Sequence, residues 1–89
     1  MNTNPFIAQT PTGKRYDVEW FGDRAGGGSK PALPVKERIT FIADVLGENE
    51  ARRPLTLDEL RAKYRAWLPK DRAFFKWLKW ARERVPVAQ

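Results

Sequence analysis

The sequence contains neither cysteine nor histidine. Without thiols the chain forms no disulfide framework and offers no thiolate nucleophile. Without imidazoles as well, it lacks the usual zinc ligands and the base of a Ser-His-Asp triad. These two absences argue against most small metal-binding domains and most small hydrolases. The charge also stays constant through neutral pH, because histidine is the side chain that normally titrates there.

Long apolar runs are missing too. No stretch approaches the roughly 18 residues that a membrane-spanning helix needs. The polar start, from Met1 to Pro5, lacks the charged and apolar regions of a signal peptide. We therefore expect a soluble, cytoplasmic protein with no membrane partner. A length of 89 residues fits one small domain.

Catalysis would have to rest on carboxylates alone. The carboxylates that lie close together in the sequence are Asp17 with Glu19, Glu48 with Glu50, and Asp58 with Glu59. The first pair shares the solvent side of an expected strand, the second lies in a charged loop, and the third suits a helix start. General acid–base catalysis by exposed, unperturbed carboxylates is inefficient at neutral pH. We predict a protein that is not an enzyme, with no catalytic residues, no metal and no cofactor.

Positive charge is abundant and unevenly distributed. The chain has 17 Lys and Arg against 11 Asp and Glu, a net charge of +6. Residues 1–50 carry 6 basic and 7 acidic side chains, whereas residues 51–89 carry 11 and 4. A surface of one sign attracts phosphate or an acidic protein, while a mixed surface mainly confers solubility. The basic half is therefore the place to expect a binding surface.

The N-terminal part predicts a flexible arm over residues 1–5 and a β-hairpin over residues 6–21. Pro11 and Gly13 supply the dihedral angles of a turn. In the second strand Tyr16, Val18 and Trp20 alternate with charged residues, which predicts one buried and one solvated side. A lone hairpin is marginal in water, so this buried side needs helices to cover it.

Residues 22–34 are rich in glycine and proline. One interpretation is a phosphate-binding loop, which requires Gly, four residues, and then Gly-Lys-Ser/Thr. Here the order is Gly27, Gly28, Ser29, Lys30, and prolines follow. The order is wrong for that motif, so we interpret the segment as a linker between the hairpin and the helices.

Apolar residues at helical spacing predict a first helix over residues 35–46, with Gly47 available as its stop. Its expected apolar side is Val35, Ile39, Ile42 and Leu46, widened by Phe41 and Val45. A second helix is predicted after Thr56, which forms a capping box with Glu59. Its expected apolar side is Leu57, Leu60, Tyr64, Trp67 and Leu68.

A third helix is predicted from about residue 70 to residue 85, because Pro69 interrupts the second helix and Asp71 suits a helix start. Its expected apolar side is Phe74, Trp77, Leu78, Ala81 and Val85, opposite Arg72, Lys76, Lys79 and Glu83. Trp80 falls away from the apolar side, in a column with Lys76 and Arg84. Residues 86–89 are expected to form a short tail. Together these elements predict a small single α+β domain, an N-terminal β-hairpin packed on three α-helices.

The basic half predicts a nucleic-acid-binding module, and we expect DNA rather than RNA as its partner. The second and third predicted helices are joined by a short corner, and the third helix is basic on its outer side. In this layout a helix enters the major groove of DNA. The corner lacks the usual glycine, however, and the third helix has no Asn or Gln to read bases. The candidate binding residues are Arg61, Arg65, Lys70, Arg72, Lys76, Lys79, Trp80, Arg82 and Arg84.

Within that set, we expect the cations at 72, 76 and 79 to contact phosphates. Arg82 or Arg84 is expected to reach a guanine edge, and Trp80 to stack on an unpaired base. Trp67 and Trp77 are assigned to the core, which leaves Trp80, and less clearly Trp20, to contact a partner.

Other interpretations stay open. The same helix suits a small inhibitor or adaptor, of the kind mobile elements use, that docks on an acidic protein surface. The charges also fit an ordinary solvated helix side. Trp80 in turn fits against the hairpin near Trp20, or beneath the stems of Lys76 and Arg84. Homodimerisation is a further option, since burial in so small a core barely offsets the cost of ordering the chain.

Overall fold

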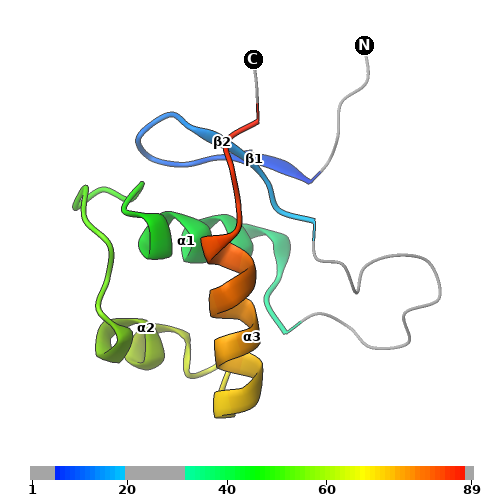
Figure 1. Cartoon of the computed structure of the whole chain (residues 1–89), viewed down its shortest axis with the longest axis vertical. Helices are drawn as coiled ribbons and strands as arrows, with labels where there is room; N and C mark the ends of the chain where they lie inside the picture. Colours follow the sequence, from blue (N-terminus) through cyan, green and yellow to red (C-terminus); the bar gives the residue numbers. More distant parts are fainter. Residues whose placement is uncertain (1–5, 20–31, 88–89) are drawn as a thin grey trace, which may run out of the picture.

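The computed structural model describes residues 6–19 and 32–87, which form a small α+β domain as predicted (Figure 1). In chain order its elements are β1 (Ile7–Gln9), β2 (Arg15–Asp17), α1 (Val35–Leu46), α2 (Leu57–Tyr64) and α3 (Asp71–Arg82). The predicted arm 1–5, the end of the second strand with Trp20, and most of the linker 22–34 lie outside the described residues.

β1 and β2 form an antiparallel hairpin in which Ile7 pairs with Asp17 and Gln9 with Arg15. Gly13 has a φ of 96° in the turn, a left-handed conformation that glycine adopts without steric cost. The chain also returns to this sheet after α3: the Val87 amide donates to the Arg15 carbonyl at 2.7 Å. Residues 86–87, predicted as part of a tail, therefore extend the hairpin on its β2 side.

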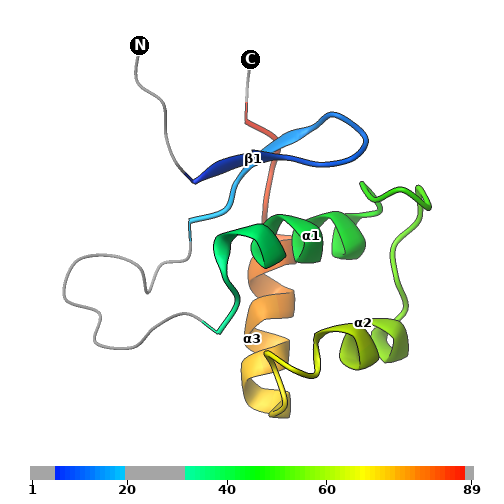
Figure 2. The ribbon, with the colours of Figure 1, turned by 180° about the vertical axis from the view of Figure 1, so that it is seen from behind.

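α1 lies between the hairpin and α2, and α3 crosses it so that its C-terminal end approaches the hairpin (Figures 1 and 2). Because α1 has neighbours on both sides, its most buried apolar residues are Phe41 and Ile42, each fully enclosed. Val35, which the spacing placed in the core, is 38% exposed, so that prediction is wrong. It lies in the first turn of the helix, next to Pro34, the N-cap residue, whose side chain makes no capping hydrogen bond.

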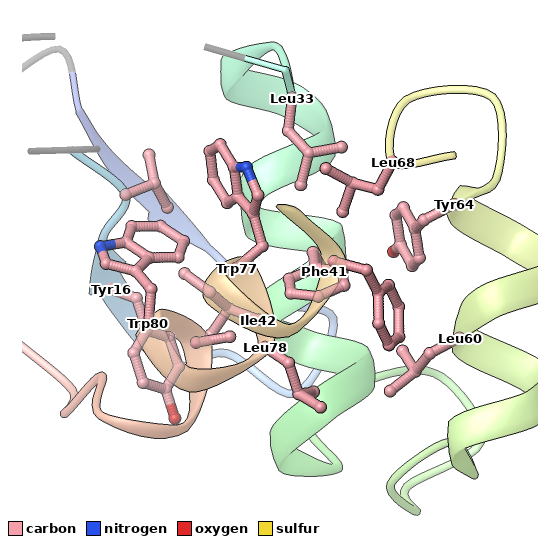
Figure 3. Packing of buried hydrophobic residues seen from close by; sticks show 13 residues of the cluster. Tyr16, Leu33, Phe41, Ile42, Leu60, Tyr64, Leu68, Trp77, Leu78 and Trp80 are labelled. Carbon is pink, nitrogen blue, oxygen red and sulfur yellow. The ribbon is translucent and has the colours of Figure 1, made fainter. Parts of the chain in front are cut away.

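The core gathers side chains from β2, α1, α2 and α3, and Ala8 of β1 packs against it (Figure 3). Phe41 meets the ring of Tyr64 edge-on, with centroids 4.8 Å apart, and that of Phe74 at 6.4 Å. These contacts join α1 to α2 and α3. The residues of the buried cluster are Tyr16, Val18, Leu33, Phe41, Ile42, Leu60, Tyr64, Leu68, Phe74, Trp77, Leu78, Trp80 and Ala81.

Two buried charged residues of α1, Arg38 and Asp44, link this helix to neighbouring parts of the chain. Arg38 donates from Nε to the Leu33 carbonyl at 2.9 Å and from Nη1 to the Val18 carbonyl at 3.2 Å. Asp44 accepts from the Tyr64 hydroxyl and from Lys63 Nζ, both at 2.7 Å. Burial and the nearby Asp44 carboxylate both raise the pKa of Tyr64, so its hydroxyl stays a donor. Asp44 thus fixes α2 against α1.

The predicted capping box of α2 is present. The Glu59 amide donates to Thr56 Oγ1 at 3.2 Å, and the Thr56 amide donates to Glu59 Oε1 at 2.9 Å. Arg53 adds a two-pronged ion pair to the same carboxylate, with both contacts at 2.9 Å. The hydrogen bonds from Arg53 and from the Thr56 backbone lower the pKa of Glu59 to about 2. This carboxylate therefore both caps the helix and holds the preceding loop.

α3 begins at Asp71, close to the predicted start, but the N-cap position is Lys70 and not Asp71. Asp71 is the first helical residue, where its charge still favours the helix dipole. The helix ends at Arg82, three residues before the predicted end. Val85, expected in the core, is 74% exposed, because the chain has by then turned toward the sheet.

Candidate nucleic-acid interface

Five residues project from the side of α3 that faces away from the core, and we call them the outer face of α3. They are Arg72, Phe75, Lys76, Lys79 and Arg82. Spacings of three and four residues place side chains on the same side of a helix. Each of the five is exposed, whereas the opposite side of α3 is buried. Sequence periodicity placed Arg72, Lys76 and Lys79 on this side correctly, but it did not assign Arg82 to it.

The outer face is poor in negative charge. In the described part of the chain, Arg72, Lys79 and Arg82 take part in no ion pair. By helical spacing two carboxylates flank this side of α3: Asp71, four residues before Phe75, which is paired with Arg61, and Glu83, the C-cap residue, four residues after Lys79. Positive charges gathered without neutralising partners create the kind of local potential that attracts anions.

The cations contributed by α2 have a different environment. Arg61 forms an ion pair with Asp71 at 2.9 Å, and its guanidinium lies over the ring of Phe75 at 5.2 Å. Arg65, the C-cap residue of α2, and Lys70, the N-cap residue of α3, are exposed at the corner between the two helices. Of the candidate set, Arg61 is therefore already engaged within the protein.

The predicted exposure of Trp80 is wrong. Its side chain is only 5% exposed and belongs to the same buried cluster as Tyr16 and Val18 of the hairpin segment (Figure 3). The ring meets that of Trp77 edge-on at 5.2 Å. Periodicity along α3 describes one packed side of the helix, but here the hairpin covers a second side. The cluster supports the interpretation of Trp80 as packed on the hairpin, and a contact with Arg84 supports the interpretation of Trp80 as shielded by a basic side chain. The expected position near Trp20 lies outside the described residues.

Arg84 covers the Trp80 ring and, contrary to the prediction, is only partly exposed. Its guanidinium lies 4.8 Å from the ring centroid. Its Nε atom is buried and has no hydrogen-bond partner in the described part of the chain. Of the two arginines predicted to reach a base edge, Arg82 is the one that is exposed.

Within the part of the chain that the structure describes, two other aromatic residues are exposed instead. Phe75, on the outer face, is 44% exposed. Trp67, assigned to the core from its spacing, is 37% exposed, because α2 ends at Tyr64 and residues 65–67 form a turn. Pro69, two residues later, was the sequence signal for this early helix end. The surface aromatic residue among the cations is thus Phe75, five residues before Trp80.

Hollows elsewhere on the described surface contain carboxylates together with cations. A cavity of about 410 Å³ between α2 and α3 is lined by Arg61 and Arg65 but also by Asp58 and Asp71. A larger one of about 710 Å³ lies beside the hairpin turn, over Asp44. The oxygens of Asp44 are already occupied by donors from the protein. Neither hollow has the excess of positive charge found on the outer face.

Comparison of the chain with family models, with curated proteins and with solved structures gave no match. Among the described residues, none of the helices has the length and apolar character needed to cross a membrane. Function therefore has to be argued from the outer face of α3 itself.

Proposed function

We propose that this protein is a non-enzymatic nucleic-acid-binding module that lays the outer face of α3 on the phosphate backbone. The observation that carries the proposal is the grouping of Arg72, Lys79 and Arg82 on one exposed helix side, without ion pairs among the described residues. Lys76 adds a fourth cation to the same side.

Phosphate binding explains this grouping of cations better than a contribution to folding stability does. Exposed ion pairs contribute little, roughly 0–1 kcal/mol, and within the described part of the chain Arg72, Lys79 and Arg82 do not form even those. Neutralising phosphates, in contrast, releases condensed counterions, a gain that grows with each contact. A helix side with several cations that form no ion pair can contact phosphates without any rearrangement of the protein.

A second candidate is supported by the exposure of Phe75. An aromatic side chain surrounded by cations also suits an inhibitor or adaptor that docks on an acidic protein surface, where aromatic residues and arginine often dominate the binding energy. The contacts in such a complex would centre on Phe75, since Trp80 is buried. Salt dependence helps to separate the two candidates, because log affinity for nucleic acid falls linearly with log salt, whereas the apolar contact of Phe75 with a protein partner persists as salt screens the charges.

The test reverses two charges on the outer face and two elsewhere. Arg72→Glu with Lys79→Glu changes the outer face, and Arg15→Glu with Lys36→Glu makes the same change in net charge at exposed positions of β2 and α1. We expect the first variant to lose at least about tenfold in affinity for heparin and for a random oligonucleotide at low salt, with the control close to wild type. Circular dichroism checks that both variants fold.

Two results would contradict the proposal. If the outer-face variant binds as well as wild type, the outer face is not the binding surface. If both variants lose the same affinity, net charge alone governs retention, and no particular surface is responsible.

A further inference from the structure

We infer that the outer face of α3 binds single-stranded nucleic acid in preference to duplex, with the ring of Phe75 as a stacking surface for a base. This inference rests on the proposed function and specifies its substrate class. It follows from the position of one exposed aromatic side chain in a row of cations, and from the way in which neighbouring side chains hold that ring.

The ring of Phe75 is exposed but held in place. Although 44% of the residue is accessible, Phe74 meets the ring edge-on at 5.3 Å, with the two planes at 76°. The guanidinium of Arg61 lies 5.2 Å from the ring centroid and is itself tied to Asp71. A ring already oriented by such contacts loses little conformational freedom when a flat ligand stacks on it.

Cations flank this ring along the helix axis in both directions. Arg72 lies three residues before Phe75, and Lys79 and Arg82 lie four and seven residues after it. With a rise of about 1.5 Å per residue, the row extends over about 15 Å. A strand whose base stacks on Phe75 would thus have basic side chains near its phosphates on either side of that base.

A cationic surface that includes stacking aromatics is the usual means of binding single strands without sequence preference. In a duplex the bases are stacked on one another, so an aromatic side chain gains access only by opening a base step. The described part of α3 also contains no Asn or Gln, the side chains that pair with adenine in the major groove. Phe75 therefore favours an unpaired strand, and the cations around it favour one without sequence preference.

The experiment compares one sequence in two forms. A fluorescein-labelled oligonucleotide of about 15 nucleotides is titrated with the full-length protein as a single strand and as an annealed duplex, and anisotropy is recorded at low salt. We expect the single strand to bind at least about fivefold more tightly. Phe75→Leu, which keeps an apolar side chain, should lose about tenfold on the single strand and less than twofold on the duplex. Phe75→Trp should restore single-strand binding.

The controls separate this inference from the proposed function. Lys79→Glu should weaken both forms. If it does so while Phe75→Leu binds the single strand like wild type, the phosphate-binding function stands and the stacking inference is wrong. Equal wild-type affinity for the two forms, or an equal loss on both in Phe75→Leu, also overturns it. If wild type binds neither form, the proposed function fails, and the inference fails with it.

Discussion

The inner and outer sides of α3 carry similar residue types but use them differently. On the inner side Trp77 and Trp80 are buried, and Arg84 lies over the Trp80 ring. On the outer side Phe75 is exposed, and Arg82 takes part in no ion pair among the described residues. Arg84 thus covers a buried ring and completes the core, whereas Arg82, on the exposed side, stays available to a partner.

The surroundings of α2 extend this contrast. Each cation there that contacts a carboxylate strengthens the fold: Arg53 holds Glu59, Arg61 holds Asp71, and Lys63 holds Asp44. The positive charge of the C-terminal half is therefore only partly available to a partner. Among the described residues, Arg72, Lys79 and Arg82 form no ion pair and lie together on α3, whereas Arg65 and Lys70, which also form none, lie at the corner between α2 and α3. The grouping on one helix side makes the outer face, and not the whole basic half, the candidate site.

The largest expected effect concerns the inner side. Trp80→Ala should lower the free energy of unfolding by about 3–5 kcal/mol, because it removes a large buried ring. Phe75→Ala on the outer side should cost about 1 kcal/mol or less, as is usual for exposed positions. Chemical denaturation followed by tryptophan fluorescence or circular dichroism measures both.

Trp80→Ala removes a large fraction of the stability that a chain of this size has, so a milder variant belongs beside it. Trp80→Phe keeps most of the ring and should cost about 1–2 kcal/mol. If instead both Trp80 variants are as stable as wild type, or if Phe75→Ala is the more damaging change, the assignment of inner and outer sides is wrong.

A smaller effect is expected where charge is matched within the fold, and it depends on pH. The pKa of Glu59 is lowered from about 4.5 to about 2 by Arg53 and by the Thr56 backbone. Its stabilising contribution is therefore complete above about pH 4.5 and is lost as the pH falls toward 2. Glu59→Gln should show a lower denaturation midpoint than wild type at neutral pH, and this difference should shrink over that window.

The matched control is Asp58→Asn, which removes the neighbouring carboxylate but leaves the contacts of Glu59 with Arg53 and Thr56 intact. A gap between Glu59→Gln and wild type that stays constant with pH would show that the carboxylate gains no stability from its charge.

Local signals predicted the elements of the fold well. The capping box of Thr56 and Glu59 and the stop at Gly47 depend on residues within one turn of each other. Gly47 has a φ of 82°, and its amide donates to the Ala43 carbonyl, as expected for a helix end. Such interactions can be inferred without knowing the tertiary structure.

Tertiary packing was harder to predict, and the errors fall at residues with distant neighbours. Periodicity could not place Trp80, because its burial depends on the hairpin segment more than 60 positions earlier. It also could not show that residues 86–87 return to β2. The cations at 72, 76 and 79 were predicted correctly because only their helix determines where they point. Which of the other cations are neutralised depends on contacts such as that of Arg61 with Asp71.

The most direct test of the central claim is the salt dependence of binding. Affinity of the full-length protein for a single-stranded oligonucleotide is measured between about 50 and 200 mM salt. With phosphate contacts from Arg72, Lys79 and Arg82, log affinity should fall linearly with log salt, with a slope of about −2, since each contact to a single strand contributes about −0.7. A flat response over this range would contradict phosphate binding by the outer face of α3.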